Sequence, residues 1–228
     1  FTLNTTGAAN TVGGDVNITT TGQLTTDQIT TTGGASTGVG RAAGLVALSG
    51  GDVNAGAITA TGSAAAGASG LAGGAGGAVT MTATDVSPTI TLSGNINTTG
   101  GLGDGIGVQG AGGTVTFNDP VILAASRTIT TGATAGNIIF GVDATVNGTA
   151  GTETLGLTAG TGNIDFNAAV GGGTGLGAVT ISSAGTVDVD AALTAAALTV
   201  TTATTFDSTG FTLNTTGAAN TVGGDVNI

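Results

Sequence analysis

The sequence predicts an all-β protein, and specifically a right-handed parallel β-helix, or β-solenoid. Three observations support this prediction: a five-residue strand pattern recurs along the chain, the composition disfavours helices, and one segment is repeated without change. In such a fold each turn of the chain, or rung, stacks on the previous rung, so equivalent residues form ladders. Crossovers between parallel strands are right-handed in nearly all cases, hence the expected hand.

The strand pattern reads glycine, any residue, valine or isoleucine, any residue, apolar residue. Because side chains alternate along a strand, its third and fifth places are expected to face inward and its fourth place outward. The glycine suits a corner that needs either a positive φ or a close backbone approach. The pattern occurs at 14–18, 51–55, 77–81, 113–117, 136–140, 162–166, 185–189 and 224–228.

Stacking these copies predicts an internal ladder of apolar side chains, which would be the structural core of the protein. The residues expected in this ladder are Val16, Val53, Val79, Val115, Phe117, Ile138, Phe140, Ile164, Phe166 and Val187.

The spacing of the copies sets the expected number of rungs. The copies that begin at Gly113 and Gly136 are one short turn apart, whereas those at Gly14 and Gly51 are separated by either two turns or one turn with an inserted loop. We expect about nine or ten rungs in 210 residues, stacking end to end into a fibre.

Composition argues against helices, because glycine accounts for 46 of 228 residues and threonine is abundant. The best helical candidate, AALTAAALTV at 191–200, is short and is expected to be strand. Three stretches of small residues, 31–50, 61–78 and 100–113, are expected to be loops that leave the coil.

Residues 211–228 repeat residues 1–18 without a difference. The chain is therefore divided into 1–210, one solenoid repeat unit, and 211–228, the start of the next identical unit. A following unit would cover the open strand edges of the preceding one. The units are either covalently joined in one long chain or are separate chains in which 211–228 fills the place of 1–18.

The charge balance restricts the partners. A net charge of −11 with only two Arg and no Lys leaves no basic surface for nucleic acid or for anionic membranes. No apolar run is long enough for a spanning helix, so membrane insertion of this segment is not expected. The expected partners are identical repeats or copies of the chain, and other cells or surfaces.

No catalytic residue is expected, because His, Lys, Cys and Tyr are all missing. The nearest acid pair, Asp188 and Asp190, is expected to be solvated on a strand. Asp104 in GGLGDG does not fit the spacing of a calcium repeat. Asp15, Asp52 and Asp225 follow a corner glycine, where capping of the turn competes with loose Ca²⁺ binding. No other cofactor is expected.

Asparagine in Asn-x-Ser/Thr triplets would accept glycans in a secreted protein. These asparagines are Asn4, Asn17, Asn97 and Asn147 in the repeat unit.

The segment AGNIIFGVDATVNGTAGTETLGLTAGTGNIDFNAAVGGGTGLGAVTISSAGTVDV at 135–189 resembles the bacterial β-strand-repeat proteins of the filamentous-haemagglutinin type. The resemblance extends in style over the whole chain. It implies a β-solenoid at a bacterial surface or in the extracellular space, in adhesion, aggregation or biofilm.

We therefore expect a structural repeat of a secreted, fibre-forming bacterial surface protein, such as a rigid filament, sheath or adhesin stalk, and not an enzyme. One alternative is an adhesin binding module whose ligand contacts lie on 31–50 and 61–78. A further alternative is an ice-binding solenoid, since regular threonine ladders on a flat face can order water.

Overall fold

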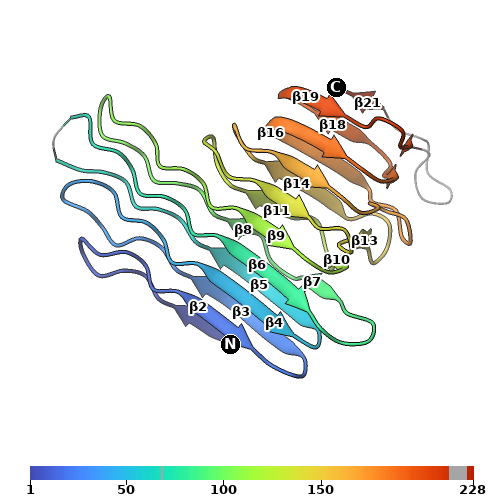
Figure 1. The fold of residues 1–228 in the computed structure, drawn as a ribbon, viewed down its shortest axis with the longest axis horizontal. Helices are drawn as coiled ribbons and strands as arrows, with labels where there is room; N and C mark the ends of the chain where they lie inside the picture. Colours follow the sequence, from blue (N-terminus) through green and yellow to red (C-terminus); the bar gives the residue numbers. More distant parts are fainter. Residues whose placement is uncertain (68, 216–224) are drawn as a thin grey trace.

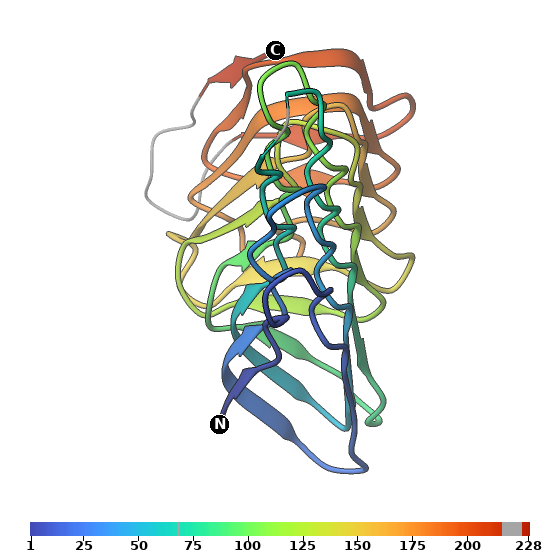
Figure 2. The same ribbon diagram turned by 90° about the vertical axis from the view of Figure 1, so that its left-hand side faces the viewer.

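The computed structural model describes residues 1–67, 69–215 and 225–228, and in these ranges the chain forms β-strands and no α-helix. Every strand pair is parallel, and the chain coils so that strands far apart in sequence lie side by side (Figures 1 and 2). The predicted all-β class and parallel β-helix are confirmed. No helix capable of crossing a membrane is found in the described part of the chain.

Each rung has three faces. Successive strands on the first face pair through residues such as Leu24, Val53 and Ile90. The strands of this face are the start of β3 (Leu24–Thr30), the start of β5 (Val53–Thr59), β7 (Ile90–Leu92), β10 (Val121–Leu123), β13 (Val146–Gly148), β17 (Leu193–Thr194) and β20 (Leu213–Asn214). Val170 bridges β13 and β17.

The second face continues directly from the first, since β3 and β5 each bend from one face to the next. Its strands are β1 (Thr2–Asn4), the ends of β3 and β5, β8 (Ile96–Asn97), β11 (Arg127–Thr130), β14 (Thr154–Thr158), the start of β16 (Ala178–Val189), β18 (Leu198–Val200) and β21 (Val226–Asn227).

The third face carries most copies of the sequence pattern. Its strands are β2 (Val16–Thr19), β4 (Val46–Gly50), β6 (Val79–Ala83), β9 (Val115–Phe117), β12 (Ile138–Phe140), β15 (Ile164–Phe166), the end of β16 and β19 (Ala203–Asp207).

The expected nine or ten rungs are too many. On the second face eight strands fall within residues 1–210, namely β1, β3, β5, β8, β11, β14, β16 and β18. In the long rungs a single turn carries a long excursion between the second and third faces: Val16 pairs with Val46, and Val79 pairs with Val115. Since these excursions use up residues without adding strands, dividing length by a short period overcounts the rungs.

Two of the segments assigned from the sequence have clear outcomes. Residues 191–200 contain β17 and β18, so the expected strand is confirmed. The loop expected at 31–50 is wrong for its last part, where β4 buries Val46 and Leu48. The alternation of apolar and other residues in VALSG covers only the five residues of β4. The small residues that precede it make this strand difficult to recognise in the sequence.

Candidate functional site

The third face holds two inward columns of apolar side chains, which together form most of the predicted ladder. Pairing aligns Val16, Val46, Val79, Val115, Ile138, Ile164, Val187 and Phe206 in one column, and Ile18, Leu48, Met81, Phe117, Phe140, Phe166 and Val189 in the other. All except Ile18 and Phe206 are buried, and these two are partly buried against the core.

Three aromatic rings stack in the second of these columns. The ring centroids of Phe117 and Phe140 are 5.1 Å apart with an interplanar angle of 13°, and those of Phe140 and Phe166 are 5.1 Å apart at 4°. This distance follows the spacing of about 4.8 Å between neighbouring strands. The rung spacing therefore holds the rings almost face to face.

Val53 is buried but belongs to a different column from the rest of the predicted ladder. It pairs with Leu24 and Ile90 on the first face. The sequences GDVNI at 14–18 and GDVNA at 51–55 are nearly identical, so the local pattern does not distinguish the two faces. Val46 takes the place on the third face that the pattern assigns to Val53.

A threonine–glycine hydrogen bond closes the corner between the second and third faces. In four rungs a threonine that follows the second-face strand donates its hydroxyl to the carbonyl oxygen of the glycine before the third-face strand. The pairs are Thr5–Gly14 (2.6 Å), Thr31–Gly44 (2.7 Å), Thr98–Gly113 (2.6 Å) and Thr131–Gly136 (2.6 Å). The threonines lie outside the five-residue pattern, so sequence reasoning missed this bond.

The glycines of this corner stack directly on one another. None of Gly44, Gly77 and Gly113 has a positive φ. A Cβ on Gly77 would instead overlap the carbonyl oxygen of Gly44, and a Cβ on Gly113 would overlap that of Gly77. Of the two reasons for glycine at this position, close backbone approach is the correct one.

Four rungs carry long excursions at this corner, which project together from the coil (Figures 1 and 2). We call them the corner extension; its four layers are 5–14, 31–44, 60–77 without residue 68, and 98–113. The expectation that 61–78 and 100–113 leave the coil is met. They are not irregular, however, because the layers are hydrogen-bonded to one another throughout.

The hydrogen bonds of the corner extension have a period of three residues. In the last layer the backbone N–H donors are Thr98, Gly101, Asp104, Gly107, Gly110 and Gly113. A period of three is that of the polyproline II helix, which has no internal hydrogen bonds and must find its partners on neighbouring segments. The period of three therefore indicates polyproline II-like segments that are hydrogen-bonded side by side.

Glycine allows these segments to approach closely. The N–H of Gly101 donates to the carbonyl of Gly74, and the N–H of Gly74 donates to the carbonyl of Ser63. A Cβ on Gly74 would overlap the carbonyl oxygen of Arg41, and one on Gly101 would overlap that of Ser63. Glycine at intervals of three or six residues, as in Gly101, Gly107, Gly110 and Gly113, is the sequence signal of these segments.

The corner aspartates bind backbone groups of the next rung. Asp15 Oδ1 accepts the N–H of Leu45 at 2.9 Å, and Asp52 Oδ1 accepts the N–H and hydroxyl of Thr89 at 3.0 and 2.8 Å. At Asp225 the backbone carbonyl accepts the N–H of Leu198. These bonds join Asp15 and Asp52 to the next rung, whereas the expected cap would bind the aspartate's own turn. Within the described ranges, no group of three or more His, Cys, Asp or Glu could hold a metal ion.

Aspartates form an outward ladder near the C-terminal end of the third face, where Asp165 pairs with Asp188 and Asp188 with Asp207. Partial burial raises the pKa of Asp165, and the negative charges of Asp188 and Asp190 raise it further. Hydrogen bonds from the hydroxyl and N–H of Thr209 lower the pKa of Asp207. Asp188 and Asp190 were predicted to be solvated strand residues. In the structure their negative charges raise the pKa of Asp165.

Glu153 is a buried acid that the sequence did not single out. Its carboxylate accepts the Thr149 hydroxyl at 2.7 Å and the N–H groups of Ala150 and Thr152. The Thr149 hydrogen bond is the main reason that the pKa of Glu153 is lowered, and burial opposes it. The carboxylate therefore organises the loop before β14.

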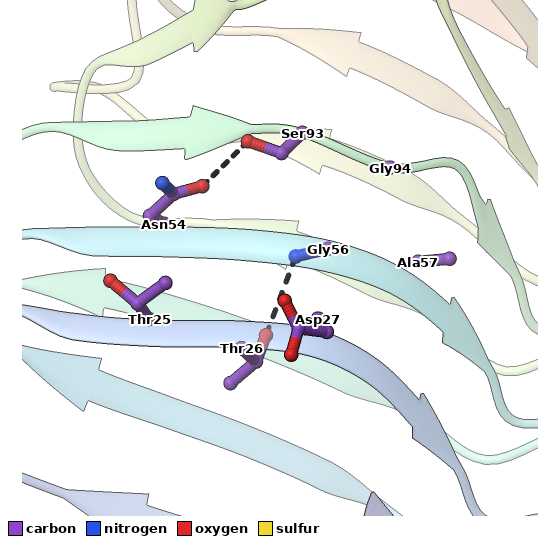
Figure 3. A pocket seen from close by; sticks show the side chains of 8 residues that line it. All are labelled: Thr25, Thr26, Asp27, Asn54, Gly56, Ala57, Ser93 and Gly94. Atoms are coloured by element: carbon purple, nitrogen blue, oxygen red, sulfur yellow. Dashed lines mark hydrogen bonds between the residues drawn. The ribbon is translucent and has the colours of Figure 1, made fainter. Parts of the chain in front are cut away.

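A shallow groove of about 400 Å³ crosses three rungs on the outside, between the first and second faces (Figure 3). Asn54 and Ser93 are hydrogen-bonded at 2.6 Å, and the Thr26 hydroxyl accepts the N–H of Gly56 at 3.3 Å. The Asp27 carboxylate is 2.9 Å from the amino group of Phe1. The groove offers hydroxyl and amide groups and a single carboxylate, which suits weak polar contacts rather than proton transfer.

The asparagines of the glycosylation triplets differ in environment. Asn147 Oδ1 accepts the N–H groups of Gly173 and Thr174, and Asn97 Oδ1 accepts the N–H and hydroxyl of Thr99. Asn4 binds the N–H of Thr6, and Asn17 is exposed on β2. Asn4 and Asn17 are both exposed, whereas Asn97 and Asn147 are partly buried.

The fold and these sites define the chain as a parallel β-solenoid with a glycine-rich corner extension. No family model, no curated protein and no solved structure matches it.

Proposed function

We propose that the chain is a structural repeat of a secreted, fibre-forming bacterial surface or extracellular protein, and that its role is mechanical rather than catalytic. The observation that carries the proposal is the unbroken column of strands on the second face, from β1 to β21. The repetition of residues 1–18 at 211–228 supports it, because an exact internal repeat is typical of repeat proteins built as long arrays.

The internal columns explain how such a rod would resist bending. Each rung is held to the next by backbone hydrogen bonds and by stacked apolar side chains, and in four rungs a corner threonine closes the rung itself. These interactions are spread evenly, so no single residue carries the function. The resemblance to filamentous-haemagglutinin-type proteins supports placing the rod at a bacterial surface, with identical units as its first partner.

The test is the mass of the denatured chain from fibres of the natural source, measured by gel electrophoresis and mass spectrometry. A mass many times that of the repeat unit means a covalent array, and a mass near 20.9 kDa means stacked separate chains. Either result supports a fibre. If the native protein is monodisperse and no filament is seen by electron microscopy, the proposal fails.

A second candidate is an adhesin module whose contacts lie on 31–50 and 61–78. The observation in its favour is Val39, which is 48% exposed in the second layer of the corner extension. Val39→Asp should abolish adhesion to cells while leaving fibres intact. Val142→Asp, at a site 78% exposed and away from the extension, is the matched control. Equal adhesion by the two variants would remove this candidate.

Ice binding receives less support. On the second face successive outward positions carry Thr128, Gly156 and Thr180, so the threonine ladder is interrupted. An ice-ordering surface needs the same pair of threonines at every rung. Inhibition of ice recrystallisation at low protein concentration would reverse this ranking.

A further inference from the structure

The corner extension makes a step in the outline of the molecule. It is built on the first four rungs, whereas the next four rungs turn the same corner through the short segments 131–137, 159–163, 182–186 and 201–202. Figure 1 shows the long layers ending beside the short corners. We call the space beside these four short corners the notch. It spans four rungs along the axis of the coil, as the corner extension does.

The last layer of the extension has an uncovered apolar side. Leu102, Ile106 and Val108 are 65%, 87% and 70% exposed. The hydroxyl of Thr134 on the next rung reaches only the carbonyl oxygen of Gly110, near the base of this layer, at 2.7 Å. Three exposed aliphatic side chains within 102–108 make this layer the candidate for an apolar interaction surface.

The surfaces that would meet a partner are almost without charge. The extension contains only Arg41 and Asp104 as charged residues, and the four short corners of the notch contain none. A protein with a net charge of −11 thus keeps its charge away from this step. An uncharged notch suits a partner that is itself apolar and rich in small residues, which is the composition of the extension.

We propose that two copies of this chain associate side by side and antiparallel, each placing its corner extension in the notch of the other. A two-fold axis between the fourth and fifth rungs brings the Leu102–Ile106–Val108 surface of one copy against the same surface of its partner. Such an interface is self-complementary, as a two-fold dimer requires.

The dimensions agree. Stacked rungs are about 4.8 Å apart, so four layers and four short corners have the same height of about 19 Å. The seven residues of one arm, 98–104, extend about 22 Å at the polyproline II rise per residue. The association does not depend on the proposed fibre; in a fibre it would join neighbouring filaments laterally.

The experiment is sedimentation equilibrium of the 228-residue chain over a wide concentration range. The wild type should approach twice 20.9 kDa. Ile106→Asp should weaken the dimer by about tenfold or more, because it places two unpaired charges in an apolar interface. Val86→Asp, at a site 98% exposed outside the step, should leave the dimer unchanged. Circular dichroism checks that both variants remain folded.

A second readout uses the absence of cysteine from the chain. Among Leu102→Cys, Ile106→Cys and Val108→Cys, at least one should form a disulfide-linked dimer on mild oxidation, whereas Val86→Cys should not. A wild type that is monomeric at every concentration overturns the proposal. A dimer that Ile106→Asp and Val86→Asp affect equally also overturns it, and points instead to end-to-end stacking, which leaves the proposed fibre standing.

Discussion

Phe140 lies between Phe117 and Phe166, with its ring centroid 5.1 Å from each. No other part of the described core stacks three rings across adjacent rungs. The middle ring contacts both neighbours, so it is the position at which one substitution disturbs three rungs.

Phe140→Ala should lower the free energy of unfolding by about 3–5 kcal/mol, because it leaves a cavity that stacked strands cannot close. Phe140→Asp should disrupt the rung altogether, since it buries an unpaired charge. Denaturant unfolding followed by circular dichroism measures both. Val142→Ala, at an exposed site on the following turn, should change stability by less than about 0.5 kcal/mol. Equal effects of Phe140→Ala and Val142→Ala would contradict the inward ladder.

Thr131→Val tests the corner hydrogen bond, because valine has the shape of threonine without its hydroxyl. The carbonyl of Gly136 would lose its partner at 2.6 Å, at a cost of about 1–3 kcal/mol. Thr116→Val, on the outward side of β9, is the control and should be nearly neutral. If the two variants have the same unfolding midpoint, the corner bond contributes nothing measurable.

Gly74→Ala should loosen the corner extension, because the added Cβ overlaps the carbonyl oxygen of Arg41. Trypsin provides the readout, since the chain contains only two cleavable residues, Arg41 and Arg127. We expect faster cleavage at Arg41 with unchanged cleavage at Arg127. Gly38→Ala lies in the same extension with open space around its Cβ and should behave as wild type. Unchanged cleavage of Gly74→Ala would mean that the layers do not need this close approach.

Asp165 should make the C-terminal rungs more stable in mild acid. Its pKa in the folded protein is raised above the usual 3.8, mainly by burial and then by Asp188 and Asp190. Folding therefore favours its protonated form, and this stabilisation is complete below pH 3.8 and is lost as the pH rises through the folded pKa. Asp165→Asn should raise the melting temperature at neutral pH and have little effect in acid.

Asp143→Asn, which removes one charge from the turn after β12, is the control for Asp165→Asn. A neutral-pH gain of the same size in both variants would show that only net charge matters.

Glu153 should have the opposite pH dependence. Its pKa is lowered from 4.5, mainly by the Thr149 hydroxyl. The stability that it contributes is present above pH 4.5 and is lost as the pH falls through the lower folded pKa. Glu153→Gln should cost about 1–3 kcal/mol at neutral pH, because the amide cannot accept all the donors of the loop. The difference from wild type should shrink in acid. A constant difference across this range would contradict an ionised Glu153.

The repeated segment shows how far local sequence determines position. Leu3 pairs with Ile29 on the second face, whereas Leu213, its copy, pairs with Leu193 on the first face. Val16 lies on the third face and Val226 on the second. Residues 216–224 of the copy lie outside the described residues. The same sequence therefore takes different faces, according to which strand edge is within reach.

The sequence by itself determined the strands, their inward residues and the parallel solenoid. Alternation of apolar and polar residues with a period of two is a local property of the sequence. A chain poor in helix formers has few other ways to bury the apolar side chains of this pattern. The stacking of Phe117, Phe140 and Phe166 was also predictable, because each occupies the fifth place of the pattern.

Only the tertiary structure decided which face each strand occupies, how the long excursions pair and which threonines close the corner. Val53 and Val16 have the same local sequence but different neighbours, since rung length varies with the excursion between faces. Gly74 and Arg41 meet only because their two layers stack. These contacts depend on the register between rungs, which is set by the packing of the whole coil and not by any short segment.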